Sequence, residues 1–428
     1  MPILDSRGVE LTTHSQRSAE RYDAALELLA SYRLDPLATI DAAIAEDPDF
    51  VSAYCLRAGA GVMAAERAAE PLIQDSLASA ERLASRASPR ERAHFAAAQA
   101  WLDGDFHRAS DLYGKIVIEH PRDLLAVQVA HVIDFYLGQQ RMLRDRVASV
   151  LPHWETGMQG FGYVLGMLAF GLEETNLFDR AEFTGRRALE IERHDAWAVH
   201  AVTHVFEMNG RPDAGIDWLE GRLDDWAKGN GLAYHNFWHL ALFMLENGDD
   251  RRVLELFDRR IWPKPSSVAL EMVDAASLLF RLYLRRVDLG SRSASVADAW
   301  SEAGYHGYYA FNDAHAAMAF VADGRLEQAR GIVAELERRA GEDGSNAAMS
   351  REVGLPLARA IVAFAEGRYD EVVSALWPLR LIAHRFGGSN AQRDVVDQTL
   401  AEAAARAGQR DLVNALAAER RFAGRSDA

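Results

Sequence analysis

Cysteine is almost absent from this chain of 428 residues, in which Cys55 is the single example. One thiol excludes an internal disulfide framework, and no histidine or lysine pattern beside it marks a nucleophile. The segment 1–21 lacks the charged and then apolar pattern of a signal peptide, and no uncharged apolar run reaches the roughly eighteen residues of a membrane span. We therefore expect a cytoplasmic protein that does not bind membranes.

Basic charge is also in short supply. The chain has 47 lysine and arginine residues against 63 aspartate and glutamate residues, which gives a formal net charge of -16. This balance opposes binding to phosphate backbones, and no basic run is flanked by aromatic residues. Nucleic acid is therefore not an expected partner. The sequence leaves open whether the chain forms a homo-oligomer.

Helix breakers are sparse within the apolar patterns. The 12 prolines seldom interrupt them, glycine falls mostly at turn positions, and alanine, leucine, arginine and glutamate dominate. Residues of these kinds have high helix propensity, and the apolar positions recur with the period of a helix. The sequence therefore predicts an all-α protein.

Several segments repeat one pattern, in which an apolar helix, a tight turn and a second helix follow one another. The turn residues are spaced by 34 or 38 residues, close to the tetratricopeptide period; they are Gly104, Gly138, Asn176, Gly210 and Gly248. The segment 95–121 carries most of the consensus. We predict a tetratricopeptide-like α-solenoid of stacked antiparallel helix pairs, forming a single helical-repeat domain over 1–428 with a polar pocket centred on 200–315.

Histidines gather in two of these helical segments. His200, His204 and Glu207 lie on one face of the first predicted helix, since each residue of a helix turns by about 100 degrees. His235 and His239 share a face of a later helix. Only one turn, one helix and a short loop separate the two segments, so we predict that the two histidine pairs face each other.

Two kinds of chemistry suit this set of residues. Histidines spaced by four residues on a helix can bind one metal ion, so the four histidines are candidate ligands of a divalent metal such as zinc, with Glu207 as ligand or base. The first histidine is followed by Ala201 rather than glutamate, which departs from the zinc-protease signature. In the metal-free alternative the same residues act as acid, base and oxyanion donors.

Further polar residues lie in apolar surroundings and extend this candidate site. Asp274 or Asp313 is expected to orient an imidazole, and His315 joins the catalytic candidates. Near the C-terminus, the sequence GGSNAQRD predicts a helix N-cap at Ser389 with exposed backbone N–H groups that bind an anion. The predicted substrate-binding residues are Asn236, Trp238, Asn312, Ser389, Asn390, Gln392 and Arg393.

The segments HAVTHVFEMNGR, YHNFWHLAL, VDAASLLFRL, FNDAHAAMA, REVGLPLARA and GGSNAQRDV together resemble the tetratricopeptide repeat protein 38 family. Their order and spacing match that family from about the first tenth of the chain to residue 400. A repeat scaffold by itself does not require these motifs. The resemblance implies a helical-repeat architecture, and it carries no reaction with it.

Each candidate also has a structural interpretation. The histidines can be core residues in a hydrogen-bond network, Asp274 can pair with Arg281, Asp313 can cap a helix, and Trp238 can be a core aromatic residue. We interpret the chain as a hydrolase-like helical-repeat enzyme that acts on a small amide, an ester or a related molecule. The alternative is a tetratricopeptide scaffold that binds a peptide or protein, with structural histidines.

Overall fold

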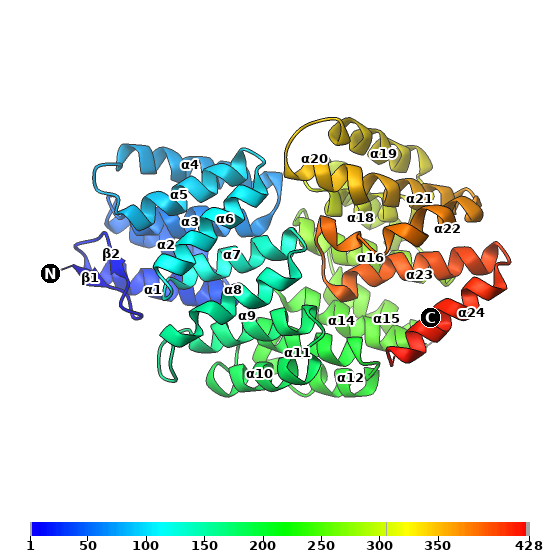
Figure 1. Ribbon diagram of the computed structural model, residues 1–428, viewed down its shortest axis with the longest axis horizontal. Helices are drawn as coiled ribbons and strands as arrows, with labels where there is room; N and C mark the ends of the chain where they lie inside the picture. The colour runs from blue at the N-terminus through cyan, green and yellow to red at the C-terminus, as the bar shows by residue number, and fades with distance from the viewer. Residues whose placement is uncertain (1, 305, 425–428) are drawn as a thin grey trace. The chain divides into compact units, whose positions relative to one another are not determined.

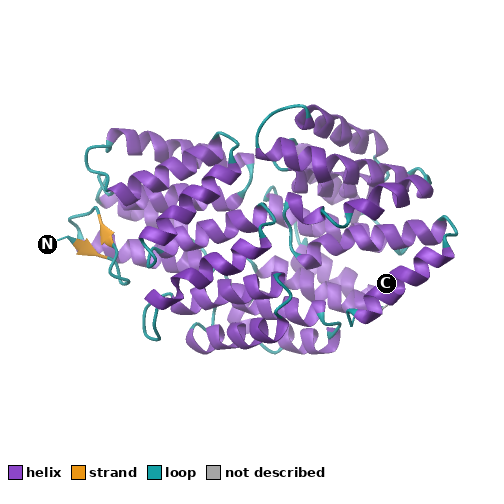
Figure 2. Ribbon diagram, viewed as in Figure 1, coloured by secondary structure: helices purple, strands orange, loops and turns teal. Residues whose placement is uncertain are grey.

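The computed structural model describes residues 2–304 and 306–424. Helices make up most of this part of the chain (Figure 2). The strands in it form one short antiparallel hairpin, β1 (Ile3–Leu4) with β2 (Glu10–Leu11). None of the helices in the described residues combines the length and apolar character needed to cross a bilayer. The prediction of an all-α fold is confirmed.

The chain divides into two compact units. The N-terminal unit consists of Met1–Val202 and Leu223–Leu232. Its helices are α1 (Gln16–Ala30), α2 (Pro36–Glu46), α3 (Val51–Ala64), α4 (Glu70–Arg82), α5 (Pro89–Leu102), α6 (Phe106–Glu119), α7 (Leu124–Tyr136), α8 (Gln140–Val150), α9 (Phe161–Glu174), α10 (Phe178–Ile191), α13 (Leu223–Trp226) and the first half of α11 (Ala196–Met208).

The C-terminal unit consists of Thr203–Arg222 and Ala233–Ala428. It contains the second half of α11, and then α12 (Pro212–Glu220), α14 (Ala233–Glu246), α15 (Asp250–Leu256), α16 (Ala269–Leu284), α17 (Arg292–Ala303), α18 (Ala310–Ala322), α19 (Leu326–Ala340), α20 (Ser345–Met349), α21 (Leu355–Ala365), α22 (Tyr369–Leu379), α23 (Asn390–Arg406) and α24 (Arg410–Phe422). A single domain over 1–428 stays a prediction.

The same turn joins the helices of most pairs. One residue of each turn has a positive φ, between 59° and 78°, a backbone conformation that favours glycine and asparagine. These residues are Gly104, Gly138, Asn176, Gly210, Gly248, Gly324, Gly367 and Gly408. The first five are the turn residues that the sequence period predicts. The repeat spacing therefore has a local cause, because each helix ends in a left-handed residue that turns the chain back.

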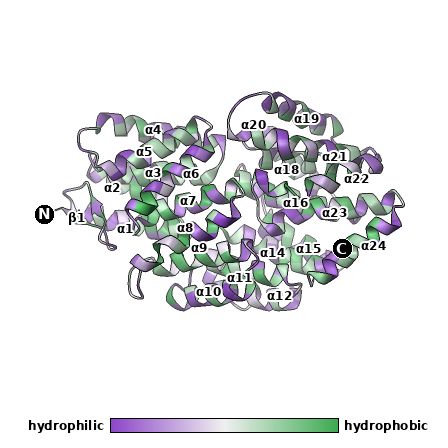
Figure 3. Ribbon diagram, viewed as in Figure 1, coloured by the Kyte–Doolittle hydropathy of each residue, from purple (hydrophilic) through white to green (hydrophobic). Residues whose placement is uncertain are grey.

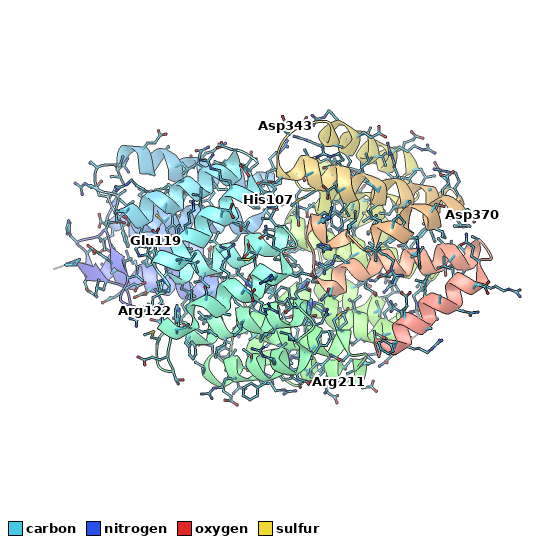
Figure 4. The ribbon with its side chains drawn as sticks, viewed as in Figure 1. His107, Glu119, Arg122, Arg211, Asp343 and Asp370 are labelled. Atoms are coloured by element: carbon cyan, nitrogen blue, oxygen red, sulfur yellow. The ribbon has the colours of Figure 1, made fainter. Side chains whose placement is uncertain are left out.

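Consecutive helices stack on one another in the N-terminal unit, where α5 to α10 contact each other in chain order, as in a helical solenoid (Figure 1). The helices carry hydrophobic and hydrophilic residues along their length (Figure 3). Charged side chains on the outside, such as Glu119 of α6 and Asp370 of α22, point away from the ribbon (Figure 4).

The C-terminal unit departs from simple stacking. In addition to neighbours in the chain, α16 contacts α14, α18 and α23, so that α16 lies between helices from distant parts of the sequence. Two π-helical turns also interrupt the pattern, at Phe257–Ile261 and Ser350–Gly354. The region 250–310 thus contains a helix on which several others pack.

Asp195 precedes the first residue of α11 and anchors the start of that helix. Its Oδ1 accepts hydrogen bonds from the backbone N–H groups of Trp197 (2.9 Å) and Ala198 (3.1 Å). Its Oδ2 has no hydrogen-bond partner and packs against Gly166 of α9, where an added Cβ would lie 2.3 Å from it. Burial raises the pKa of the Asp195 carboxyl from 3.8 to about 8.

We predict that Asp195→Asn removes a pH dependence of stability. Because the pKa of Asp195 is raised in the folded state, the folded protein keeps a proton between about pH 4 and pH 8 that the unfolded chain has released. The free energy of unfolding therefore falls as the pH rises through this window. The asparagine keeps an oxygen for the N–H groups but does not titrate. Urea denaturation across this range should give a flatter profile than the wild type.

The control is Asp75→Asn, at an exposed position on α4. It should leave the wild-type pH profile unchanged. An unchanged profile in Asp195→Asn would contradict the assignment of this pH dependence to Asp195.

Candidate functional site: a buried histidine and carboxylate cluster beside a pocket

Three of the four predicted histidines meet inside the C-terminal unit. His204 lies on α11, and His235 and His239 lie on α14. One ring nitrogen of each histidine lies within 4.8 Å of those of the other two. The ring centroids of His204 and His239 are 4.5 Å apart, and those of His235 and His239 are 4.8 Å apart. His204 and His239 are fully buried, and His235 is 9% exposed.

His200 belongs to the N-terminal unit, one helical turn before His204 on α11. Its ring lies against Phe170 of α9 at 5.3 Å and Trp197 at 4.8 Å between centroids. The side chain is buried, with 2% exposure. Within its own unit, His200 thus packs among aromatic rings.

Two buried carboxylates hold two of the imidazoles. The Nδ1 of His239 lies 2.7 Å from Oε2 of Glu207, one turn after His204 on α11. The Nδ1 of His235 lies 2.7 Å from Oδ2 of Asp274 on α16. A carboxylate can only accept, so each Nδ1 carries the hydrogen and each Nε2 points to the other side of its ring. Asp274 thus makes the contact predicted for an orienting group, and Glu207 makes the same kind of contact.

The contacts of Asp274 connect the histidines to the GGSNAQRD motif near the C-terminus. Burial raises the pKa of the Asp274 carboxyl, while His235, Arg281 and a hydrogen bond from Gln392 act in the opposite direction. Gln392 also accepts a hydrogen bond from the backbone N–H of Ser389 at 3.0 Å. A chain of contacts therefore runs from α14 through α16 to the start of α23.

Ser389 is the N-cap of α23, as the sequence predicts, and forms a capping box with Gln392. Protein groups occupy two of the backbone N–H groups at this helix start, and the anion site stays a prediction. The Ser389 hydroxyl accepts from the backbone N–H of Gln392, and the Arg393 guanidinium donates to the Gly388 carbonyl and to Asn390 Oδ1. These residues thus fix the helix start and place Gln392 beside Asp274.

Arg281, two turns after Asp274 on α16, strengthens this junction. Its guanidinium donates to the carbonyls of Ala391 (3.1 Å) and Gln392 (3.4 Å), and to the Ser277 hydroxyl. It also lies 5.4 Å from the ring centroid of Trp238. Arg281 is therefore a buried link between α16, α14 and α23, and sequence analysis names it only as a partner for Asp274. The sequence signal for a buried role of Arg281 is its position as a lone arginine in the apolar segment VDAASLLFRLYL.

Asn236 and Trp238, both predicted to bind substrate, are fully buried on α14. The Trp238 ring stacks on His235 at 5.3 Å with an interplanar angle of 10°. Trp238 thus packs against the cluster as a core aromatic residue, which is the structural interpretation of its sequence position.

The predicted residues of α18 have other partners. Both Asp313 oxygens accept from the backbone N–H of Gly307, at 2.9 and 3.2 Å, so Asp313 holds the loop before α18 rather than a cluster histidine. Asp313 is also not the N-cap of α18, as the alternative interpretation expected. It lies within the first turn of this helix, and Tyr309 is the N-cap. The Nδ1 of His315 donates to the Phe311 carbonyl at 2.8 Å, and burial lowers the His315 pKa to about 4. Asn312 is buried on the same helix.

A pocket of about 610 Å³ lies next to the cluster. It is formed by α14, α16, α23 and α24, with Glu207 of α11 in its wall. Its volume falls in the range of ligand pockets. Of the predicted catalytic residues, Glu207 is the one that lines it. The remaining lining side chains are Leu242, Leu245, Glu246, Arg281, Leu284, Arg285, Asp394, Gln398, Ala401, Glu402, Ala405, Val413, Asn414, Leu416, Ala417, Arg420 and Arg421.

Most residues of this pocket carry no signal of a binding site in the sequence. Its lining residues on α23 and α24 follow an ordinary amphipathic pattern, which is typical of any helix that packs on one side. Only the contact of α23 with α16 makes their polar residues part of a concave surface.

A scan against protein-family models finds no match. Among solved structures, the chain is similar to the TPR domain of P58(IPK), with 16% identity and a TM-score of 0.22 over 92% of this chain and 99% of that one. It is also similar to yeast Tom70, with 10% identity and a TM-score of 0.42 over 92% of this chain and 88% of that one. At these values, neither similarity bears on function.

We predict that Asp274→Ala lowers the free energy of unfolding by about 1–3 kcal/mol, because it leaves the buried His235 Nδ1–H and the Gln392 amide without their acceptor. Asp274→Asn keeps an oxygen at this place and should cost less. Urea denaturation gives both values.

The matched control is Asp258→Ala, which breaks an exposed ion pair with Arg292 in the same unit. Such pairs contribute little to stability, so the loss should stay below about 1 kcal/mol. Equal losses for Asp258→Ala and Asp274→Ala would show that the buried contact has no special weight.

Proposed function

We propose that the chain is a cytoplasmic, tetratricopeptide-type binding protein, in line with its resemblance to the tetratricopeptide repeat protein 38 family, and that its ligand enters the pocket of the C-terminal unit. The observation that carries this proposal is the 610 Å³ pocket on helices α14, α16, α23 and α24. Helical repeats commonly present such surfaces to peptides and proteins.

The lining of the pocket favours a peptide over a purely apolar molecule. Leu242, Leu245 and Leu284 supply an apolar wall, and charges of both signs surround it. Glu402 pairs with Arg406 at 2.7 Å, and Arg285 pairs with Asp250 at 3.4 Å, so ion pairs supply charges of both signs at the pocket wall. A short peptide segment with an apolar residue between charged ones fits this lining. The overall acidic charge disfavours nucleic acid as the ligand.

Burial of the histidines favours binding over catalysis. His204 and His239 are fully buried, and neither is in the pocket wall. A general base must come within hydrogen-bonding distance of the group that it deprotonates. A molecule held in the pocket meets Glu207 before it meets any of these imidazoles.

The test fills the pocket without touching its charges. Ala401→Trp on α23 and Ala417→Trp on α24 each place an indole in the pocket wall. Ala418→Trp is the matched control, because Ala418 is exposed on α24 and does not line the pocket. We expect short peptides selected from a displayed random library on the wild-type protein to bind the control normally and both pocket variants at least about tenfold more weakly, a loss of about 1.4 kcal/mol.

Selected peptides that bind all four proteins equally would contradict the proposal, as would a selection that enriches no peptide. Circular dichroism of the three variants checks that the helices are retained.

Hydrolysis of a small amide or ester is the second candidate function. The observation in its favour is the pair of Glu207 and His239 at 2.7 Å, with Glu207 in the pocket wall. This function requires Glu207→Gln to abolish hydrolysis of simple esters and amides, such as p-nitrophenyl acetate, by the purified protein. Absence of hydrolysis by the wild type, or equal rates for the wild type and the variant, excludes it for these substrates.

A further inference from the structure

The histidine cluster has features that a hydrogen-bonded core alone does not require. Three imidazoles from α11 and α14 each offer a ring nitrogen within 4.8 Å of the others. A nitrogen ligand lies about 2.0–2.1 Å from zinc, so ligand nitrogens around one ion are about 3–4 Å apart. The cluster is therefore close to the size of a metal site as it stands.

The orientation of two of these imidazoles supports the same conclusion. His235 and His239 each use Nδ1 for a carboxylate, at 2.7 Å in both cases. Histidine ligands of metals usually donate their other ring N–H to a carboxylate or a carbonyl, which fixes the tautomer and raises the basicity of the ligating nitrogen. This arrangement occurs twice here, for two histidines of α14 whose carboxylate partners come from α11 and α16.

Charge gives a third argument. Glu207 and Asp274 are 4% and 1% exposed, so two acidic groups are buried beside the three imidazoles. Burying carboxylates is costly unless positive charge or hydrogen bonds compensate. Arg281 and Gln392 already compensate part of the charge of Asp274, and a divalent cation bound by the imidazoles would add to this for both carboxylates.

We propose that His204, His235 and His239 bind one divalent transition-metal ion, and that Glu207 and Asp274 are positioning residues that hold two of the ligands. Imidazole nitrogen suits zinc, cobalt, nickel and copper, whereas magnesium and calcium prefer oxygen. Three protein ligands leave room for one more ligand on a four-coordinate ion. This site is separate from the proposed peptide pocket, and Glu207 is in contact with both.

The test uses the full chain without a histidine tag, stripped with a chelator and then titrated with zinc or cobalt alone. We expect one equivalent of metal per chain, a visible absorption of bound cobalt that reports nitrogen ligands, and a melting temperature that falls on stripping and recovers with zinc. His204→Ala and His239→Ala should each lose stoichiometric binding.

Glu207→Gln and Asp274→Asn should still bind but with affinities about 10–100-fold lower, since they alter only groups behind the ligands. The matched controls lie on α18 of the same unit. His315→Ala removes a buried histidine whose Nδ1 donates to the Phe311 carbonyl, and Asp313→Asn changes a buried aspartate that holds Gly307. Both controls should bind zinc as the wild type does.

Wild-type protein that takes up no stoichiometric zinc or cobalt would overturn the proposal and leave a hydrogen-bonded core. Stoichiometric binding of wild-type affinity in both His204→Ala and His239→Ala would overturn it too, because the metal would then be elsewhere. If a histidine variant fails to fold, two other measurements still test the metal site. They are the melting temperature of the wild type after metal removal and zinc addition, and the zinc affinity of Asp274→Asn. The peptide measurements are independent of these results, so either proposal can fail without the other.

Discussion

Two buried hydrogen bonds, from His235 to Asp274 and from His239 to Glu207, constrain the arrangement of helices in the C-terminal unit. They join α14 to α16 and to the second half of α11. A shift of one helix by a single turn would leave a carboxylate and an imidazole buried without partners, at a cost of about 1–3 kcal/mol for each group. The relative positions of these helices are therefore set by polar contacts as well as by packing.

The helix α16 extends this constraint to the end of the chain. Asp274 receives a hydrogen bond from Gln392, and Arg281 donates to carbonyls at the start of α23. The capping box of Ser389 fixes the side chain of Gln392 in turn. Once α23 is held on α16, the pocket between α14, α16, α23 and α24 follows, because its wall is made of the remaining side chains of the same helices. The cluster and the pocket are thus products of one set of contacts.

Glu207 belongs to both the histidine cluster and the pocket. Its carboxylate holds His239 on one side and borders the pocket on the other. A ligand charge placed beside it would act on the His239 hydrogen bond at short range, where the low dielectric of the interior makes electrostatic effects strong.

The sequence by itself determined the helical fold and its turns, because these depend on local properties. Helix propensity, apolar period and left-handed residues such as Gly104 and Gly248 act over a few positions of the chain. It also placed His204 with Glu207 on one helix face and Ser389 at a helix start, for the same reason. Tertiary structure decided which carboxylate meets which imidazole. Asp274 and Asp313 both lie in apolar helical segments, yet Asp274 faces His235 while Asp313 faces the backbone of Gly307. Tertiary structure alone also made the pocket, since side chains of α14 and α24 become neighbours only when helices far apart in the chain pack together, and no local pattern encodes that choice.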